Sequence, residues 1–474
     1  MNRSKNGCDL GLIGLGVMGR NFLLNIADHG FSVAGYDLDG EKAKRLEQEK
    51  SPDHDIRPAG NLAGFIDELK RPRAVMLLVP AGDPVDTVLK ELSPRLDPGD
   101  MIVDGGNSHF TDTERRSRFM EEKSLLYMGA GISGGEAGAR NGPSIMPGGP
   151  SEGYERLAPI LEKAAAHVDG EPCVAHMGKG SAGHYVKMVH NGIEYGVMEL
   201  IAEAYDFLKR GLGLSARELA EVFEKWNGGP LKSYLVQITA RIFSKTDEGT
   251  DRPLVEQILD AARQKGTGRW TSQEAMALQA PTPTIDAAVA MRNLSADTAA
   301  RERTARVFPD PVASPAGSRQ DWIEGLGRAL HAGMILTFTQ GMNLLAKASA
   351  QYGYGLDLST VARIWRGGCI IRTSLLEEIR AAYEKDAGLS NLMLDPDLAR
   401  SLKRLQTSLR SVCAAACKAG IPAPGFAACL GYFDGFRSAR LPANLVQAQR
   451  DYFGSHRYER VDAEGTFHTD WEGP

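Results

Sequence analysis

Short aliphatic runs alternate with amphipathic segments along the first third of the chain. Five runs have the β-branched and aliphatic composition of strands: 10–15, 31–37, 73–80, 101–106 and 124–132. Segments such as GRNFLLNIADHG and PVDTVLKELSPRL lie between them and have the periodicity of helices. This alternation predicts an α/β, Rossmann-type domain with a doubly wound, mainly parallel sheet over residues 1–180.

Long helical patterns replace this alternation in the rest of the chain and predict a large all-α domain over residues 181–440. One pattern continues past Gly192 and Gly196, so we expect these glycines to mark close packing against another helix. The last segment, 441–474, is polar and aromatic with little helical periodicity. Such an extended C-terminal tail is either disordered or docked on a partner subunit, and its aromatic side chains favour docking.

Composition and charge narrow the classes of protein that fit this pattern. The chain has 474 residues, of which 42% are hydrophobic and 24% are charged, as in soluble proteins of two or three domains. The net charge of −5 gives no reason to expect nucleic acid or a membrane surface as a partner. Six cysteines fit a reducing cytoplasm, and neither a secretory signal nor a transmembrane run is evident. Cys413 and Cys417 lie one helical turn apart, which fits a buried helix face better than a metal site.

A glycine motif lies where the first predicted strand would become the first helix: Gly14, Leu15, Gly16, Val17, Met18 and Gly19. G-x-G-x-x-G in that position binds the pyrophosphate of a dinucleotide, and an acid at the end of the next strand binds the ribose. Asp37 ends that strand. A second copy at 178–183 has no such strand after it. The first copy therefore predicts dinucleotide binding.

The residues after the second strand bear on the choice of cofactor. The 2′-phosphate of NADP requires a cation there and is repelled by carboxylates. Asp37, Leu38 and Asp39 provide two acids and no adjacent arginine, which favours NAD and leaves NADP as the alternative. Lys42 is the nearest argument for NADP, and Asp39 has a simpler interpretation as a helix cap.

Four polar residues share one face of a predicted helix. Lys187, His190, Asn191 and Glu194 are spaced so that their side chains fall within about 100° of arc. Such a face is either a solvated surface or an acid/base site. A dehydrogenase needs a base for the hydroxyl proton, and a buried lysine can serve; a desolvated carboxyl group can donate a proton. We favour the acid/base interpretation.

Three further clusters have the composition of anion or sugar sites. Asn107 follows a predicted strand at the edge where such sheets bind ligands. Residues 131–149 are predicted to form a glycine-dense loop whose Ser133, Gly134 and Gly135 offer backbone N–H groups. Lys265 and Thr267 lie in a basic, glycine-containing turn that suits a phosphate or is a plain surface turn.

Taken together, these motifs resemble the decarboxylating 6-phosphogluconate dehydrogenase family of the pentose phosphate pathway. The resemblance runs through IGLGVMG, DGGNS, GISGGEAGARNGPSIMPGG, KMVHNGIEYG, QKGTGRW, IWRGGCIIR and LPANLVQAQRDYFGSH. It implies a homodimer in which each C-terminal tail reaches the other subunit. It also implies oxidation of 6-phosphogluconate at carbon 3, loss of CO2 and tautomerisation to ribulose 5-phosphate. No metal is required, because a β-keto acid already has an electron sink.

The resemblance also implies roles for individual residues. Lys187 would be the base and then the acid at the carbon 3 oxygen, and Glu194 would protonate carbon 1 of the enediol. The sugar acid would be held by Asn107, Ser133, Gly134, Gly135, His190, Asn191 and Tyr195. Its phosphate would be bound by Lys265, Thr267 and Arg292, together with Arg450 and His456 of a partner subunit's tail. The adenosine-side loop of the cofactor site would be Val79, Pro80 and Ala81, with Asn107 near both ligands.

The chain departs from the family's pattern at the cofactor site. NADP-using members commonly carry Asn-Arg-Thr where this chain has Asp37, Leu38 and Asp39, and a frequent lysine is Pro80 here. We therefore expect an NAD-preferring or dual-specificity enzyme. The alternatives are a β-hydroxyacid dehydrogenase of the 3-hydroxyisobutyrate type, whose chains are shorter, and a non-catalytic dinucleotide-binding sensor.

Overall fold

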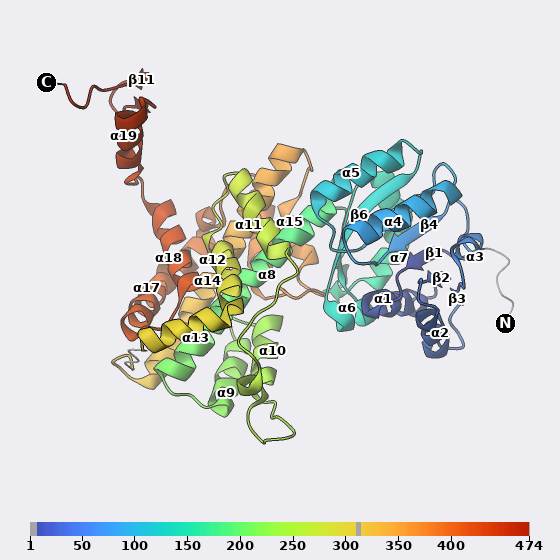
Figure 1. Ribbon diagram of the computed structural model, residues 1–474, viewed down its shortest axis with the longest axis horizontal. Coiled ribbons are helices and arrows are strands. Elements are labelled where there is room, and N and C mark those ends of the chain that lie inside the picture. Colours follow the sequence, from blue (N-terminus) through green and yellow to red (C-terminus); the bar gives the residue numbers. More distant parts are fainter. Residues whose placement is uncertain (1–6, 310–313, 474) are drawn as a thin grey trace.

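The computed structural model describes residues 7–309 and 314–473, and the first part of that chain forms a seven-stranded sheet (Figure 1). Its order is β3-β2-β1-β4-β5-β6-β7, and every neighbouring pair is parallel except β6 with β7. The strands are β1 Leu10–Ile13, β2 Val33–Tyr36, β3 Ile56–Pro58, β4 Ala74–Leu77, β5 Met101–Asp104, β6 Leu126–Ser133 and β7 Ser144–Gly148. The order on either side of β1 is that of a doubly wound nucleotide-binding sheet, which confirms the expected fold class.

The five strands expected from the sequence are confirmed, with ends shifted by at most three residues. β3 and β7 were not expected, because each is short and contains a proline. The prediction of a loop over 131–149 is wrong: this segment forms the end of β6, the helix α6 Gly135–Asn141, and β7. Some of its glycines allow close packing instead. A Cβ added to Gly148 would lie 2.2 Å from the backbone nitrogen of Gly183.

Helices cover both faces of the sheet, and successive residues of a strand enter different cores. In β5, Met101 and Val103 belong to one apolar cluster and Ile102 belongs to another, as the two-residue period of a strand requires. The other helices of this part are α1 Val17–Asp28, α2 Gly40–Glu49, α3 Leu62–Asp67, α4 Asp83–Leu92, α5 Phe110–Glu121 and α7 Ser151–Ala164. A small hairpin, β8 His167–Val168 and β9 Glu171–Pro172, leads to the helical part.

The second part of the chain is helical and is built around α8 Ala182–Asp206 and α14 Arg319–Tyr352, which pack against each other (Figure 1). A π-helical turn, Phe207–Gly211, follows α8 directly. The remaining helices are α9 Ala216–Asn227, α10 Tyr234–Phe243, α11 Thr267–Ala277, α12 Pro283–Ala296, α13 Thr298–Val307, α15 Leu358–Ile364, α16 Leu375–Lys385, α17 Pro396–Ala419 and α18 Pro424–Arg437. No helix within residues 7–309 and 314–473 has the length and apolar character to cross a bilayer.

The glycines within α8 bring neighbouring helices close. A Cβ on Gly192 would lie 2.5 Å from Cγ2 of Thr271 in α11, and one on Gly196 would lie 2.7 Å from Cγ2 of Thr337 in α14. The expectation that Gly192 and Gly196 mark close helix packing is therefore confirmed. Because α8 also lies on the sheet, it forms the junction between the two parts of the chain.

The C-terminal tail projects from the body after α18 (Figure 1). It contains α19 Ala443–Gly454 and an antiparallel pair, β10 Tyr458–Glu459 and β11 Thr466–Phe467. The low helical periodicity of this segment concealed α19, whose side chains are nearly all exposed. Asp451 is the one buried residue of the described tail, so this segment has a polar centre in place of an apolar core. The outer ends of the predicted domains, residues 1–6 and 474, lie outside the described residues.

Candidate active site

The helix α8 lies directly on the carboxyl-terminal half of β6. A Cβ on Gly131 would lie 2.3 Å from Cβ of Lys187, and one on Gly183 would lie 2.2 Å from the carbonyl oxygen of Gly129. Glycine is therefore required at these positions for the helix to approach the sheet this closely. The contact places Lys187 beside the sheet edge at which doubly wound folds bind ligands.

The polar face of α8 is buried and is not a solvated surface. Lys187 is 6% exposed, His190 is 0% exposed and Asn191 is 8% exposed. The side chain of Glu194 is 21% exposed. Lys187, His190, Asn191 and Glu194 are here called the α8 ridge. A buried amine and a nearly buried carboxyl group on one ridge are costly unless they are neutralised or paired. This observation removes the surface interpretation of the four residues.

Burial moves the pKa values of the two ends of the ridge in opposite directions. Burial lowers the pKa of the Lys187 amine, although the charge of Glu194 acts in the other direction. Burial raises the pKa of Glu194, while Lys187 and Arg292 act against that rise. The environment thus favours a neutral amine at Lys187 and a protonated carboxyl group at Glu194. These are the forms that a proton acceptor and a proton donor need.

His190 links the α8 ridge to the sheet through a hydrogen bond with Ser133 of β6. Its Nε2 lies 3.2 Å from Oγ of Ser133, and its Nδ1 lies 3.1 Å from Oδ1 of Asn191. The Nδ1 atom is 3.8 Å from a carboxyl oxygen of Glu194. Burial and the neighbouring Lys187 hold the pKa of His190 well below its ordinary value, so the ring is neutral and Ser133 and Asn191 fix its orientation.

Sequence reasoning assigned no role to two residues from the run IWRGGCIIR. Trp365 is fully buried and meets the His190 ring edge-on, with 5.5 Å between ring centroids. The buried Cys369 thiol donates to the carbonyl oxygen of Trp365 and lies near enough to Lys187 to affect its pKa. The only signal in the sequence was the run itself, because neither an indole nor a lone thiol at this spacing indicates a site.

The segment that carries Trp365 and Cys369 also supports the residues after β6. A Cβ on Gly134 would lie 2.5 Å from the carbonyl oxygen of Gly368, and Ser144 donates its backbone N–H to the same oxygen at 2.9 Å. Gly134 has φ +120°, a conformation that favours glycine. Ser133, Gly134 and Gly135 are therefore held between α8 and the 364–372 segment, next to His190.

The glycine motif has the shape that a dinucleotide needs. Gly14 has φ +102°, and a Cβ on Gly19 would lie 1.9 Å from the carbonyl oxygen of Gly14. By contrast, a Cβ on Gly16 would meet nothing within 4 Å, so open space lies against the backbone where a pyrophosphate approaches. Leu15 is buried beneath this turn, whereas Val17 is exposed at the start of α1 and Met18 is partly buried.

Asp37 is already paired within the protein. It accepts the backbone N–H of Leu15 at 2.8 Å, and Nζ of Lys42 lies 3.2 Å from both of its carboxyl oxygens. Asp39 caps α2 by accepting the backbone N–H of Glu41, which supports its simpler interpretation, and Leu38 is exposed. The strand end thus carries a cation as well as an acid.

The other predicted cofactor residues follow the ends of adjacent strands. Val79, Pro80 and Ala81 come after β4, and Asn107 comes after β5 and is exposed. Because β4 and β5 are parallel neighbours, both loops lie at one edge of the sheet.

The predicted phosphate residues meet the end of the α8 ridge in part. The Arg292 guanidinium of α12 lies over the Tyr195 ring, 3.6 Å from its centroid, and a Cβ on Gly268 of α11 would lie 2.3 Å from Cδ2 of the same ring. Thr267 is buried at the start of α11, and Lys265 is exposed just before it. α8, α11 and α12 therefore meet at Tyr195, one residue after Glu194, and α12 places an arginine on its ring.

Arg450 and His456 are not brought to this cluster within one chain. Both are exposed on the tail, which extends away from α8 and the sheet (Figure 1). Their predicted role needs a second copy of the chain.

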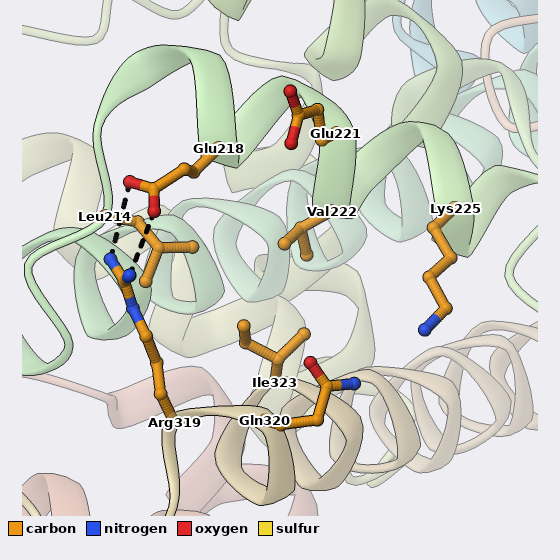
Figure 2. A pocket seen from close by; sticks show the side chains of 8 residues that line it. All are labelled: Leu214, Glu218, Glu221, Val222, Lys225, Arg319, Gln320 and Ile323. Carbon is orange, nitrogen blue, oxygen red and sulfur yellow. Dashed lines mark hydrogen bonds and ion pairs between the residues drawn. The ribbon is translucent and has the colours of Figure 1, made fainter.

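A surface hollow between α9 and α14 is separate from these residues (Figure 2). Its charged lining residues are largely paired, as with Arg319 and Glu218 at 2.9 Å, and none of the predicted site residues lines it. In the described residues, no group of three or more His, Cys, Asp or Glu side chains is placed to hold a metal ion.

Comparison with known proteins covers nearly the whole chain. The family model described as the NAD binding domain of 6-phosphogluconate dehydrogenase matches residues 9–178, and the one described as the C-terminal domain of that enzyme matches residues 183–471. A Synechococcus elongatus protein named 6-phosphogluconate dehydrogenase, decarboxylating, is 52% identical over 97% of this chain and 98% of its own length. A Bacillus subtilis protein whose name adds NADP(+)-dependent is 46% identical over 98% of both chains.

Among solved structures, that of a Plasmodium falciparum protein is similar over the same range. Plasmodium falciparum 6-phosphogluconate dehydrogenase has a TM-score of 0.95 and 44% identity, covering 98% of this chain and 100% of its own. Its title describes an apo form, a complex with its cofactor NADP+ and a complex with its substrate 6-phosphogluconate.

Proposed function

The chain belongs to the 6-phosphogluconate dehydrogenase family, and from that premise we propose how its residues perform the reaction. It is an oxidoreductase that converts 6-phosphogluconate to ribulose 5-phosphate and CO2 while a nicotinamide dinucleotide is reduced. One observation carries the assignment of roles: Lys187 and Glu194 are buried on one ridge of α8, and their pKa values move in opposite directions.

The neutral Lys187 amine accepts the proton of the carbon 3 hydroxyl group while the hydrogen on carbon 3 leaves as hydride. The bound nicotinamide supplies the hydride acceptor. The product is a 3-keto acid, and the protonated Lys187 then donates to its ketone oxygen while the bond between carbons 1 and 2 breaks and CO2 departs. The remaining enediol takes a proton from Glu194 on the carbon that becomes carbon 1 of ribulose 5-phosphate. The hydroxyl group on the neighbouring carbon gives its proton back to Lys187 and becomes the ketone.

The neighbouring residues hold the sugar acid against these two groups. His190 and Asn191 extend the same ridge, and Ser133 reaches it from the end of β6. We assign Ser133, Gly134, Gly135 and Asn107 to the carboxylate and hydroxyl groups. Tyr195 is assigned to the sugar acid, and Lys265, Thr267 and Arg292 are assigned to its phosphate, because Arg292 is held over the Tyr195 ring beside Glu194.

The dinucleotide is assigned to the glycine turn 14–19, the loop 79–81, Asn107 and the strand end 37–39. Asp37 favours the ribose of NAD, and we infer an NAD-preferring or dual-specificity enzyme. Lys42 contacts Asp37 and leaves room for NADP, the cofactor named for the Bacillus subtilis and Plasmodium falciparum proteins.

A homodimer is proposed from the exposed apolar residues and the projecting tail. Leu445, Val446, Tyr452 and Phe453 of the tail are exposed, as are Met276, Leu294, Val307 and Phe308 on α11 to α13 and just beyond. Exposed apolar side chains in such number are typical of an interface. In the proposed dimer, the tail delivers Arg450 and His456 to the partner's phosphate site. The expected division at residues 180/181 and 440/441 fits this arrangement.

The compartment is proposed from the cysteines. All six are unpaired, and four of them are buried, which fits a reducing cytoplasm.

Initial rates on 6-phosphogluconate and on an unphosphorylated 3-hydroxy acid, each with NAD and NADP, test the function. We expect 6-phosphogluconate to be much the better substrate. A preference for the unphosphorylated acid would indicate a 3-hydroxyisobutyrate-type enzyme, and nucleotide binding without turnover would indicate a sensor.

A further inference from the structure

A single buried arginine joins the two loops that follow β4 and β5. Arg116 of α5 is 1% exposed and donates hydrogen bonds from all three of its guanidinium nitrogens. Nη2 donates to the carbonyl oxygen of Gly82 at 2.9 Å, and Nη1 donates to Oγ of Ser108 at 3.1 Å. Gly82 and Ser108 lie on different loops, so one planar group fixes both.

Two carboxylates hold the guanidinium in place between these loops. Asp86 of α4 accepts from Nε and from Nη2, each at 3.0 Å, which is the bidentate geometry that arginine forms best. Asp104, at the end of β5, accepts from Nη1 at 3.4 Å. Asp86 lies in α4, after the loop that contains Gly82, and Asp104 directly precedes the loop that contains Ser108.

The first loop carries residues assigned to the cofactor alone, and the second carries Asn107, which is assigned to both the cofactor and the sugar acid. Residues 79–82, here called the nucleotide loop, include the positions assigned to the cofactor. Residues 105–108, here called the sugar loop, include Asn107. Asp104 shapes the sugar loop by accepting from Oγ of Ser108 at 2.6 Å and from the backbone N–H of Gly106 at 3.1 Å.

The same helix also touches the catalytic ridge. Oγ1 of Thr113, one turn before Arg116, lies 2.6 Å from Nδ1 of His184, and His184 lies one turn before Lys187 on α8. The element that carries Arg116 is thus bonded to both loops and to the helix that carries the proposed acid and base.

We propose that Arg116 is a positioning residue that holds the nucleotide loop and the sugar loop in one mutual arrangement, so that cofactor and sugar acid bind in register. This inference rests on the proposed function. Arg116 is buried and is assigned to neither ligand. Its loss weakens the binding of both, because each loop is released from a common support.

The test compares Arg116→Met and Arg116→Lys with Arg115→Met, a matched control. Arg115 is adjacent and also bonds to Asp86, but it is 58% exposed and reaches neither loop. The dissociation constant of whichever dinucleotide the wild type binds more tightly, NAD+ or NADP+, and that of 6-phosphogluconate are measured separately by calorimetry, well below the melting temperature of each variant. A purely structural role would lower the melting temperature and leave both constants unchanged.

We expect Arg116→Met to weaken both ligands by about tenfold or more, a change of ~1.4 kcal/mol in each binding free energy. Arg116→Lys keeps the positive charge but lacks the planar guanidinium with its several donors, so it should recover only part of the affinity. Arg115→Met should bind both ligands as the wild type does. If Arg116→Met does not fold, Asp86→Ala serves in its place. Asp86 stands on the nucleotide side, so weaker binding of 6-phosphogluconate in that variant must pass through Arg116.

Unchanged constants in the folded Arg116 variants, or a loss confined to one ligand, would overturn the proposal. That result is separate from a failure of the proposed function, in which the wild-type protein itself would not bind 6-phosphogluconate.

Discussion

Gly131 of β6 and Lys187 of α8 are in such close contact that a Cβ on the glycine would fall 2.3 Å from Cβ of the lysine. The proposed catalytic amine thus takes its position from a strand residue that has no side chain. The backbone of β6 lies directly beneath Lys187. The helix can come this close to the sheet because residue 131 has a hydrogen atom in place of a side chain.

Gly131→Ala is expected to displace Lys187. Because the contact is between a backbone-linked Cβ and the root of the lysine side chain, neither can rotate away, and α8 must shift. We expect kcat/KM for 6-phosphogluconate to fall by about a hundredfold, since small misplacements of reacting groups have effects of this size. Gly431→Ala on the exposed face of α18, where an added Cβ meets nothing within 4 Å, should leave kcat/KM unchanged.

The pH dependence of kcat/KM should be bell-shaped. Lys187 must be neutral to accept a proton, and its pKa is lowered by burial, so activity should rise with pH through a value below that of an ordinary lysine. Glu194 must be protonated to donate, and its pKa is raised by burial, so activity should fall as pH rises through a value above that of an ordinary glutamate.

Glu194→Gln tests which group controls the falling limb. We expect this variant to lose most activity and to lose that limb, while the rising limb remains. Glu199→Gln is the matched control, because Glu199 lies on the same helix and burial raises its pKa to about 7. If the falling limb persists in Glu194→Gln and disappears in Glu199→Gln, Glu194 is not the proton donor.

Lys42 should decide how well the enzyme uses NADP. With Lys42→Ala, the carboxylate of Asp37 loses its cationic neighbour, 3.2 Å away, and repels the 2′-phosphate more strongly. The ratio of kcat/KM for NADP to that for NAD should fall by about tenfold, as for the loss of one close charge contact. Lys44→Ala, which removes only an exposed partner of Glu41, should leave the ratio unchanged.

Asp451 should determine whether the tail keeps its shape. The buried carboxylate accepts from the side chains of His468 and Trp471 and from the backbone N–H groups of Arg457 and Thr469. These bonds hold its pKa below the ordinary value, so its contribution to stability is present above the unfolded-state pKa and is lost as pH falls.

We expect Asp451→Asn to accelerate tryptic cleavage within 443–473 at neutral pH. Asp462→Asn, which removes an exposed partner of Arg460, is the control and should cleave at the wild-type rate. Equal cleavage of all three proteins would show that the tail does not depend on the Asp451 bonds.

The sequence allowed the fold class, the strands β1, β2, β4, β5 and β6 and the α8 ridge to be predicted, because each depends on periodicity or on a local motif. Gly192 and Gly196 were identified as packing positions for the same reason. The 131–149 segment was misread because glycine has two uses, turns and close approach, and only the position of α8 distinguishes them. Trp365, Cys369 and Arg116 could not be recognised, since each acts through contacts with residues distant in sequence.

The tail shows a different limit. A helix is usually recognised in a sequence by its apolar stripe, but α19 has almost no buried face in one chain. Its organisation depends on hydrogen bonds to Asp451, which no periodicity reveals.

The most direct test of the account is to measure reduced nicotinamide and released CO2 together, from 6-phosphogluconate, with the wild type and with Lys187→Ala. The wild type should yield the two products in equal amounts. Lys187→Ala should bind the cofactor with wild-type affinity and lose turnover by about three orders of magnitude or more, as expected for loss of a general base. Wild-type rates of both products from the variant would contradict the assignment of Lys187 as the group that moves the proton.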